Sequence, residues 1–130
     1  MSINILIVDD AIVARKMIKR HLTGSPYEDA NIIEASSGEQ GLELFNENID
    51  VVMSDWNMPG MSGIEFVKEI RSMEQGWSNT DSKPIPIIMI TTEGTIQKVN
   101  QAKEEGANEY IVKPFSAEQL VDALERVLED

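Results

Sequence analysis

Five short apolar runs alternate with longer segments of helical periodicity along this chain, which leaves few folds open to it. The runs are rich in β-branched residues and do not alternate with polar ones, which is typical of parallel strands buried on both faces. The predicted strands are Ile3–Val8, Asn31–Ala35, Val51–Ser54, Pro86–Ile90 and Glu109–Val112. Right-handed helical crossovers between them predict a three-layer α/β sandwich, doubly wound as (βα)5 with helices on both faces of the sheet.

Apolar residues recur at helical spacing between these runs. They are Val13 and Met17, then Gly41, Leu44 and Phe45, then Phe66, Val67, Ile70 and Met73, and finally Leu120, Leu124, Val127 and Leu128. Capping boxes mark two helix starts, one pairing Ser62 with Glu65 and the other Ser116 with Gln119. In such a box each side chain satisfies a backbone N–H that the helix leaves free.

Two segments are less regular. A helix over residues 95–105 offers only Ile96, Val99 and Ala102 for apolar contact before Gly106 ends it, so we expect it to be the least firmly packed. Residues 75–82 lack periodicity and are rich in turn formers, which predicts a surface loop with Trp77 as a contact at its rim.

Length and composition narrow the class of protein. A chain of 130 residues forms one domain, and the absence of cysteine excludes disulfide scaffolds, thiolate zinc sites and cysteine nucleophiles. The net charge of −12 repels nucleic acid and anionic lipid, so cations and basic surfaces are the expected partners. The apolar run from Ile5 to Val8 is too short for a signal peptide or a membrane span. We therefore expect a cytoplasmic protein without membrane insertion.

Polar residues follow the predicted strands at their carboxyl ends, where ligands bind in parallel sheets. They are Asp9, Asp10, Asp55, Thr91 and Lys113. Carboxylates about 4 Å apart repel by roughly 4 kcal/mol at an effective dielectric of about 20, so a bare cluster would destabilise the fold. A hard divalent cation relieves this repulsion, and Mg²⁺ prefers oxygen ligands and completes its shell with phosphate. The pattern predicts a magnesium site.

The same residues suggest phosphoryl chemistry. Asp55, after the central strand, is the best candidate for a nucleophile toward phosphorus, because the adjacent Asp9 and Asp10 are better placed as metal ligands. Mg²⁺, the Lys113 ammonium and donors near Thr91 would neutralise the transferred group. The alternative is that Asp10 merely caps the first helix. The convergence of three acids with a hydroxyl and an ammonium favours the site.

Four motifs carry a family resemblance: DD at 9–10, DWNMPGMSG at 55–63, T at 91 and KPF at 113–115. The chain resembles the receiver domain of two-component response regulators, especially the stand-alone chemotaxis members, over its whole length. The resemblance implies a flavodoxin-like parallel sheet of strand order 2-1-3-4-5, a strand order already described for this family. It also implies one receiver domain over residues 1–130 with no output domain.

The resemblance assigns roles to the metal and acceptor residues. It implies that Asp55 accepts a phosphoryl group from a histidine kinase, and that Asp10, Asp55 and the Asn57 carbonyl bind Mg²⁺ directly. Asp9 would bind the ion through water. Thr91 would hydrogen-bond the phosphoryl group.

The resemblance also implies a switch. Lys113 would pair with the phosphoryl group and precede a cis peptide bond. Thr91 would be drawn inward by the added charge, and Tyr110 would rotate from an exposed position into the space that Thr91 vacates. Asn57 and Glu93 would tune dephosphorylation. Thr92 departs from the family pattern, in which a smaller residue is usual, and its bulk could hinder the approach of a phosphodonor or water.

These observations predict a monomeric signalling protein rather than a conventional enzyme. Its partners would be a histidine kinase, a downstream target such as the flagellar motor switch or another kinase, and a phosphatase. A phosphorelay shuttle or phosphate sink is the alternative within this class. A flavodoxin-like electron carrier is disfavoured because Asp9 and Asp10 would repel a flavin phosphate. A haloacid-dehalogenase-type hydrolase would need two Asp residues separated by one residue.

Overall fold

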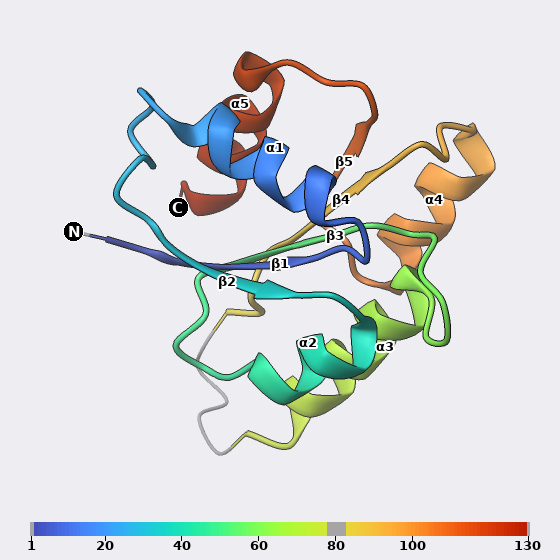
Figure 1. Ribbon diagram of the computed structural model, residues 1–130. Coiled ribbons are helices and arrows are strands. Elements are labelled where there is room, and N and C mark those ends of the chain that lie inside the picture. Colours follow the sequence, from blue (N-terminus) through green and yellow to red (C-terminus); the bar gives the residue numbers. More distant parts are fainter. Residues whose placement is uncertain (1, 78–82, 130) are drawn as a thin grey trace.

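The computed structural model describes residues 2–77 and 83–129, in which five strands alternate with five helices (Figure 1). In chain order the elements are β1 (Asn4–Val8), α1 (Ile12–Leu22), β2 (Asn31–Ala35), α2 (Gly38–Leu44), β3 (Val51–Ser54), α3 (Gly63–Gln75), β4 (Ile87–Thr91), α4 (Ile96–Glu105), β5 (Glu109–Val112) and α5 (Ala117–Leu128). The predicted alternation of strands and helices is confirmed.

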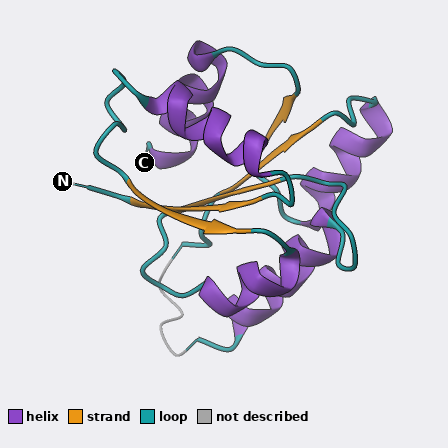
Figure 2. Cartoon of the chain, viewed as in Figure 1, coloured by secondary structure: helices purple, strands orange, loops and turns teal. Residues whose placement is uncertain are grey.

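The five strands form one parallel sheet of order β2-β1-β3-β4-β5. Figure 2 shows the three layers, with α1 and α5 on one face of the sheet and α2, α3 and α4 on the other. Val8, the last residue of β1, pairs with Ser54 at the end of β3. This register brings the residues that follow β1 and β3 together at one edge of the sheet, and the flavodoxin-like topology is confirmed.

Each face of the sheet carries its own hydrophobic core. Leu6, Val8 and Val52 pack toward α2, α3 and α4, whereas Ile5 and Ile7 pack toward α1 and α5. These strand side chains are all fully buried. Burial on both faces explains why the central strands β1, β3 and β4 are almost continuous apolar runs, whereas the edge strands β2 and β5 keep partly exposed positions.

The predicted core contacts of α1 are wrong. Val13 and Met17 are 68% and 47% exposed, and the helix buries Ile18 and Leu22 instead. The helix carries two apolar stripes, and the packing against the sheet and α5 selects the second one. The expectation of weak packing for α4 is confirmed, because Ala102 is its one buried residue and Ile96, another predicted contact, is 78% exposed.

Element boundaries shift by small amounts. The fourth strand begins at Ile87 rather than at Pro86, which lacks the N–H that a ladder requires. Helix α3 reaches Gln75, and residues 78–82 of the predicted loop lie outside the described part of the chain. Trp77 is partly buried, and its ring stacks on Phe45 at 5.4 Å at the border of the core, which agrees with the predicted rim contact. Among the described residues, no helix has the length and apolarity to cross a membrane.

Candidate functional site

Three carboxylates meet where β1 and β3 end. Asp9, Asp10 and Asp55 each offer an oxygen, and these oxygens lie within 4.8 Å of one another. Asp9 is only 3% exposed, and its Oδ1 accepts a hydrogen bond from the Ala11 amide at 2.9 Å. Arg15 donates to the Asp9 carbonyl oxygen at 2.6 Å. The structure therefore brings the predicted acids together and holds the buried one firmly.

The alternative role for Asp10 as a helix cap is wrong. The N-cap of α1 is Ala11, which makes no side-chain capping bond. Asp10 itself is exposed beside the other two carboxylates. The Asp10 carboxylate therefore does not cap α1 and belongs to the acidic cluster.

Lys113 balances part of this negative charge. Its Nζ lies 3.0 Å from Asp9 Oδ2 and 3.6 Å from Asp55 Oδ2. The backbone amide of Lys113 donates to the Thr91 carbonyl at 2.8 Å, which fixes the residue just beyond β5, and the Lys113–Pro114 peptide bond is cis as the resemblance implies. Three carboxylates facing one ammonium leave a formal charge of about two negative units, which favours a cation in the cluster.

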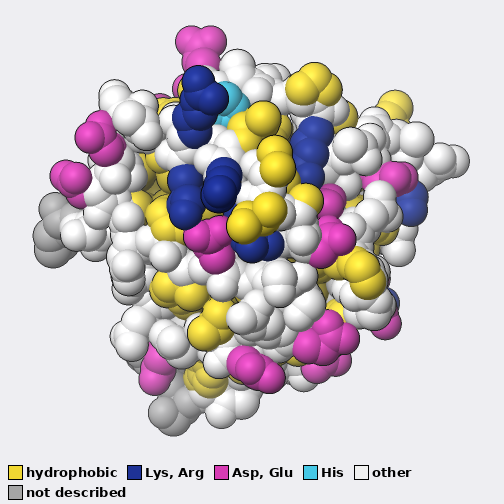
Figure 3. Space-filling model, in the orientation of Figure 1, with side chains coloured by type: hydrophobic (Ala, Val, Ile, Leu, Met, Phe, Trp, Pro, Cys, Tyr) yellow, Lys and Arg dark blue, Asp and Glu magenta, His cyan; other side chains and the backbone are white. Residues whose placement is uncertain are grey.

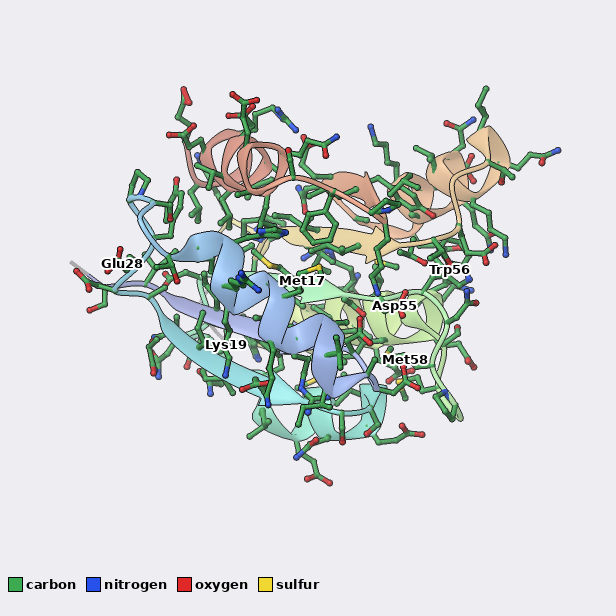
Figure 4. The ribbon with its side chains drawn as sticks, turned by 45° about the horizontal axis from the view of Figure 1, so that its top comes forward. Met17, Lys19, Glu28, Asp55, Trp56 and Met58 are labelled. Carbon is green, nitrogen blue, oxygen red and sulfur yellow. The ribbon has the colours of Figure 1, made fainter. Side chains whose placement is uncertain are left out.

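The loop after β3 folds back closely on Asp55. Its Oδ1 accepts from the Trp56 amide at 2.7 Å, and the Gly63 amide donates to the Trp56 carbonyl at 2.8 Å. A Cβ on Gly63 would lie 2.2 Å from the Asp55 carbonyl oxygen, so only glycine fits there. Gly60 turns the same loop with φ of +77°. Figure 4 shows Asp55 and Trp56 together at this end of the sheet.

The two predicted switch residues meet at the β4–α4 loop. Thr91 is fully buried, and its Oγ1 accepts from the Glu93 amide at 3.3 Å. The Tyr110 hydroxyl donates to the Glu93 carbonyl oxygen. Tyr110 is thus half-buried in this structure, and not in the exposed position from which the resemblance has it rotate. Burial raises the pKa of Tyr110, and the negative charges of Glu93 and Asp55 raise it further.

Asn57 and Glu93, the residues that the resemblance links to dephosphorylation, also contact each other. The Asn57 amide Nδ2 donates to the Glu93 carboxylate at 2.9 Å. This bond joins the loop after β3 to the loop after β4.

Two features of the site escaped sequence reasoning. The Lys98 ammonium lies 4.6 Å from the ring centroid of Trp56, and no spacing rule links a residue in α4 with one after β3. An apolar pocket of about 310 Å³ opens between α1 and the loop after β5, lined by Ala14, Met17, Ile18, Thr92, Lys113, Pro114 and Phe115. Only the KPF motif could have hinted at it, because the pocket forms where distant segments pack.

The fold and the strand-end site define a class of protein. A family model described as a response regulator receiver domain matches residues 5–125, and the chain belongs to this family. It is similar to the chemotaxis protein CheY1 of Helicobacter pylori, with 44% identity over 126 residues and 95% of each chain covered. It is also similar to the chemotaxis protein CheY homolog of Campylobacter jejuni, with 40% identity covering 95% of this chain and 91% of the relative.

Solved structures agree with this family. Chemotaxis protein CheY4 of Vibrio cholerae has a TM-score of 0.83 and 36% identity, covering 98% of this chain and all of that one. The BeF3-activated receiver domain of DrrB has the same TM-score at 26% identity, with both chains fully covered.

Proposed function

We propose that this protein is a phosphorylation-switched response regulator of a chemotaxis pathway, acting in the cytoplasm, and that a histidine kinase phosphorylates it on Asp55. The observation that carries the proposal is the cluster of Asp9, Asp10 and Asp55 within 4.8 Å, flanked by Lys113. The assignment to chemotaxis draws on the relatives, several of which are named chemotaxis proteins.

The donor set of the cluster fits Mg²⁺. Every ligand on offer is an oxygen, and the formal charge of about two negative units matches a divalent ion. Asp10, Asp55 and the Asn57 carbonyl would hold the ion directly, and Asp9 would hold it through water. When bound, Mg²⁺ supplies positive charge that shields the acids and the oxygens of the incoming phosphoryl group.

The protein's own residues account for the rest of the transfer. A carboxylate oxygen of Asp55 attacks phosphorus, the bond from phosphorus to the donor histidine nitrogen breaks, and its electron pair stays on that nitrogen. The Lys113 ammonium, already 3.6 Å from Asp55, pairs with the new phosphoryl oxygens. The Thr91 hydroxyl lies on the neighbouring strand and donates to the same group.

Phosphorylation would then act through Thr91, Glu93 and Tyr110. It adds about 1.5 to 2 negative charges at Asp55, which draws the Thr91 hydroxyl away from its bond to the Glu93 amide. The β4–α4 loop and Tyr110 respond together because the tyrosine hydroxyl is bonded to this loop. The exposed side chains of Ile96 and Val112 lie on α4 and β5, and we assign the target surface to this region. A flagellar motor switch or another kinase would bind there.

The kinase would approach from α1. This helix exposes three apolar side chains beside the pocket, those of Ile12, Val13 and Met17. It contains no acidic residue, although the protein as a whole is strongly acidic, and its basic residues are Arg15, Lys16, Lys19 and Arg20. Figure 3 shows Lys and Arg side chains around apolar ones on this face. An acidic helical surface on the phosphodonor domain complements it in charge and polarity.

Labelling with acetyl phosphate tests the acceptor site. We expect one phosphoryl group on Asp55 in the presence of Mg²⁺, and none in EDTA or in Asp55→Asn. Asp50→Asn is the matched control, because Asp50 precedes the opposite end of β3, where it binds the Asn4 amide. Undiminished labelling of Asp55→Asn would refute the assignment.

Protein capture tests the switch separately. A purified motor-switch protein should bind the beryllofluoride-treated chain more tightly than the untreated chain, and treatment should not affect Asp55→Asn. Equal binding with and without beryllofluoride would contradict this choice of target while leaving the acceptor site intact.

A further inference from the structure

The ammonium of Lys98 lies on the indole of the residue that follows the phosphoacceptor. The distance from Nζ to the centroid of the Trp56 ring is 4.6 Å, within the range of a cation–π interaction. Trp56 is only 6% exposed and Lys98 is half-buried, so the contact is partly shielded from water. The contact joins α4 to the loop after β3.

Lys98 belongs to the first turn of α4. Its backbone amide donates to Oγ1 of Thr95, the N-cap residue, at 3.2 Å. A contact made by the Lys98 side chain therefore helps to fix the position of the start of the helix. The Thr95 cap directly follows the β4–α4 loop, which contains Glu93.

Apolar packing holds α4 only weakly. Ala102 is its buried residue, whereas Ile96 in the first turn is 78% exposed. Segments with few buried apolar contacts lie at the low end of local stability. The position of the first turn therefore depends on its polar contacts.

Two such contacts tie this segment to the Asp55 loop, and they use consecutive residues. Asn57 donates to the Glu93 carboxylate at 2.9 Å, and the Lys98 ammonium lies over the indole ring of Trp56. The Tyr110 hydroxyl donates to the carbonyl oxygen of the same Glu93. The position of Glu93 thus depends on both ties.

We infer that Lys98 is a positioning residue of the switch, whose cation–π contact with Trp56 holds the start of α4 in the arrangement that lets Tyr110 bond to Glu93. The consequence for activation depends on the proposed function, but the structural contact does not. The contact should favour the arrangement seen here, with Tyr110 bonded to Glu93, over one in which Tyr110 is exposed, by about two- to fivefold.

Lys98→Met tests this inference because it keeps the length of the side chain and removes the charge. Lys103→Met is the matched control, because it makes the same change in the last turn of α4. Lys98→Arg keeps a cation and should restore the parent behaviour. The measurements are the indole N–H resonance of Trp56, amide hydrogen exchange of Val99, whose amide bonds to Thr95, and beryllofluoride titration at fixed Mg²⁺.

In Lys98→Met we expect a shifted Trp56 resonance, about two- to fivefold faster exchange at Val99, and a half-saturating beryllofluoride concentration raised by the same factor. The resonance of Trp77, which stacks on Phe45, should not move. Unchanged exchange in Lys98→Met, or equal effects of Lys98→Met and Lys103→Met, would overturn the inference. If the parent does not respond to beryllofluoride, the proposed function fails, and exchange at Val99 still decides the role of Lys98.

Discussion

Adding one methyl group at Gly63 should destabilise the fold strongly, because the loop after β3 passes directly over this residue. A Cβ there would lie 2.2 Å from the Asp55 carbonyl oxygen and 2.8 Å from the Trp56 Cα. Both atoms belong to the backbone, so they cannot rotate away. The carbonyl would have to retreat by about 0.8 Å to reach the 3.0 Å below which such contacts essentially never occur.

Overpacking of this kind costs up to about 3 kcal/mol, and a backbone displacement lies at the upper end of that range. For a domain of this size about 3 kcal/mol corresponds to a fall of roughly 9 to 15 °C in Tm. Urea and thermal denaturation followed by circular dichroism measure the loss. Labelling by acetyl phosphate should slow as well, because the displaced carbonyl belongs to Asp55.

Gly76→Ala is the matched control for Gly63→Ala. Gly76 has φ of −84°, and a Cβ there would meet only the Met73 carbonyl oxygen at 3.5 Å. Its substitution should change the free energy of unfolding by no more than about 0.5 kcal/mol. A Gly63→Ala protein within about 1 kcal/mol of the parent, or an equal loss in both variants, would refute the reasoning.

Glu34→Gln should lower the free energy of unfolding by about 1 kcal/mol at neutral pH, because hydrogen bonds from two cations of α1 lower the pKa of Glu34. The difference in unfolding free energy between the parent and Glu34→Gln should vanish as pH falls through the lowered pKa of Glu34. Urea denaturation at a series of pH values measures this difference, and a difference that persists in strong acid would contradict the prediction. Burial is the main cause of the raised pKa of both Tyr27 and Tyr110. The stability that the neutral phenols contribute should therefore be fully present below their ordinary pKa of 10.0 and be lost as pH rises through the raised pKa of the folded state. An ultraviolet absorbance titration should show both phenols ionising at a higher pH than tyrosine does in the unfolded chain. Thr92→Ala should speed loss of the phosphoryl group from Asp55, since a smaller side chain admits water, and decay as slow as in the parent would count against a role for position 92.

The layered fold was predictable because its signals are local. Buried parallel strands leave uninterrupted apolar runs, and the two capping boxes at Ser62 and Ser116 mark helix starts that the structure confirms. The acidic cluster was predictable for a related reason. Asp9 and Asp55 directly follow strands whose carboxyl ends must meet in a parallel sheet.

Features that depend on packing between distant segments were not predictable. In α1 the spacing of four fits Val13 with Met17 as well as Ile18 with Leu22, and only the sheet and α5 decide which pair is buried. The contact of Lys98 with Trp56 joins residues 42 positions apart and leaves no mark in either local sequence. Both features concern surfaces and helix placement, which the hydrophobic pattern determines least.

A crystal structure of the protein grown with Mg²⁺ and beryllofluoride is the most direct test of the central claim, that the clustered acids bind a divalent cation and leave Asp55 free to accept phosphorus. We predict a cation about 2.1 Å from oxygens of Asp10, Asp55 and the Asn57 carbonyl, with beryllofluoride on Asp55 and paired with Lys113. A cluster that binds no cation under these conditions, or beryllofluoride attached to another residue, would contradict the account.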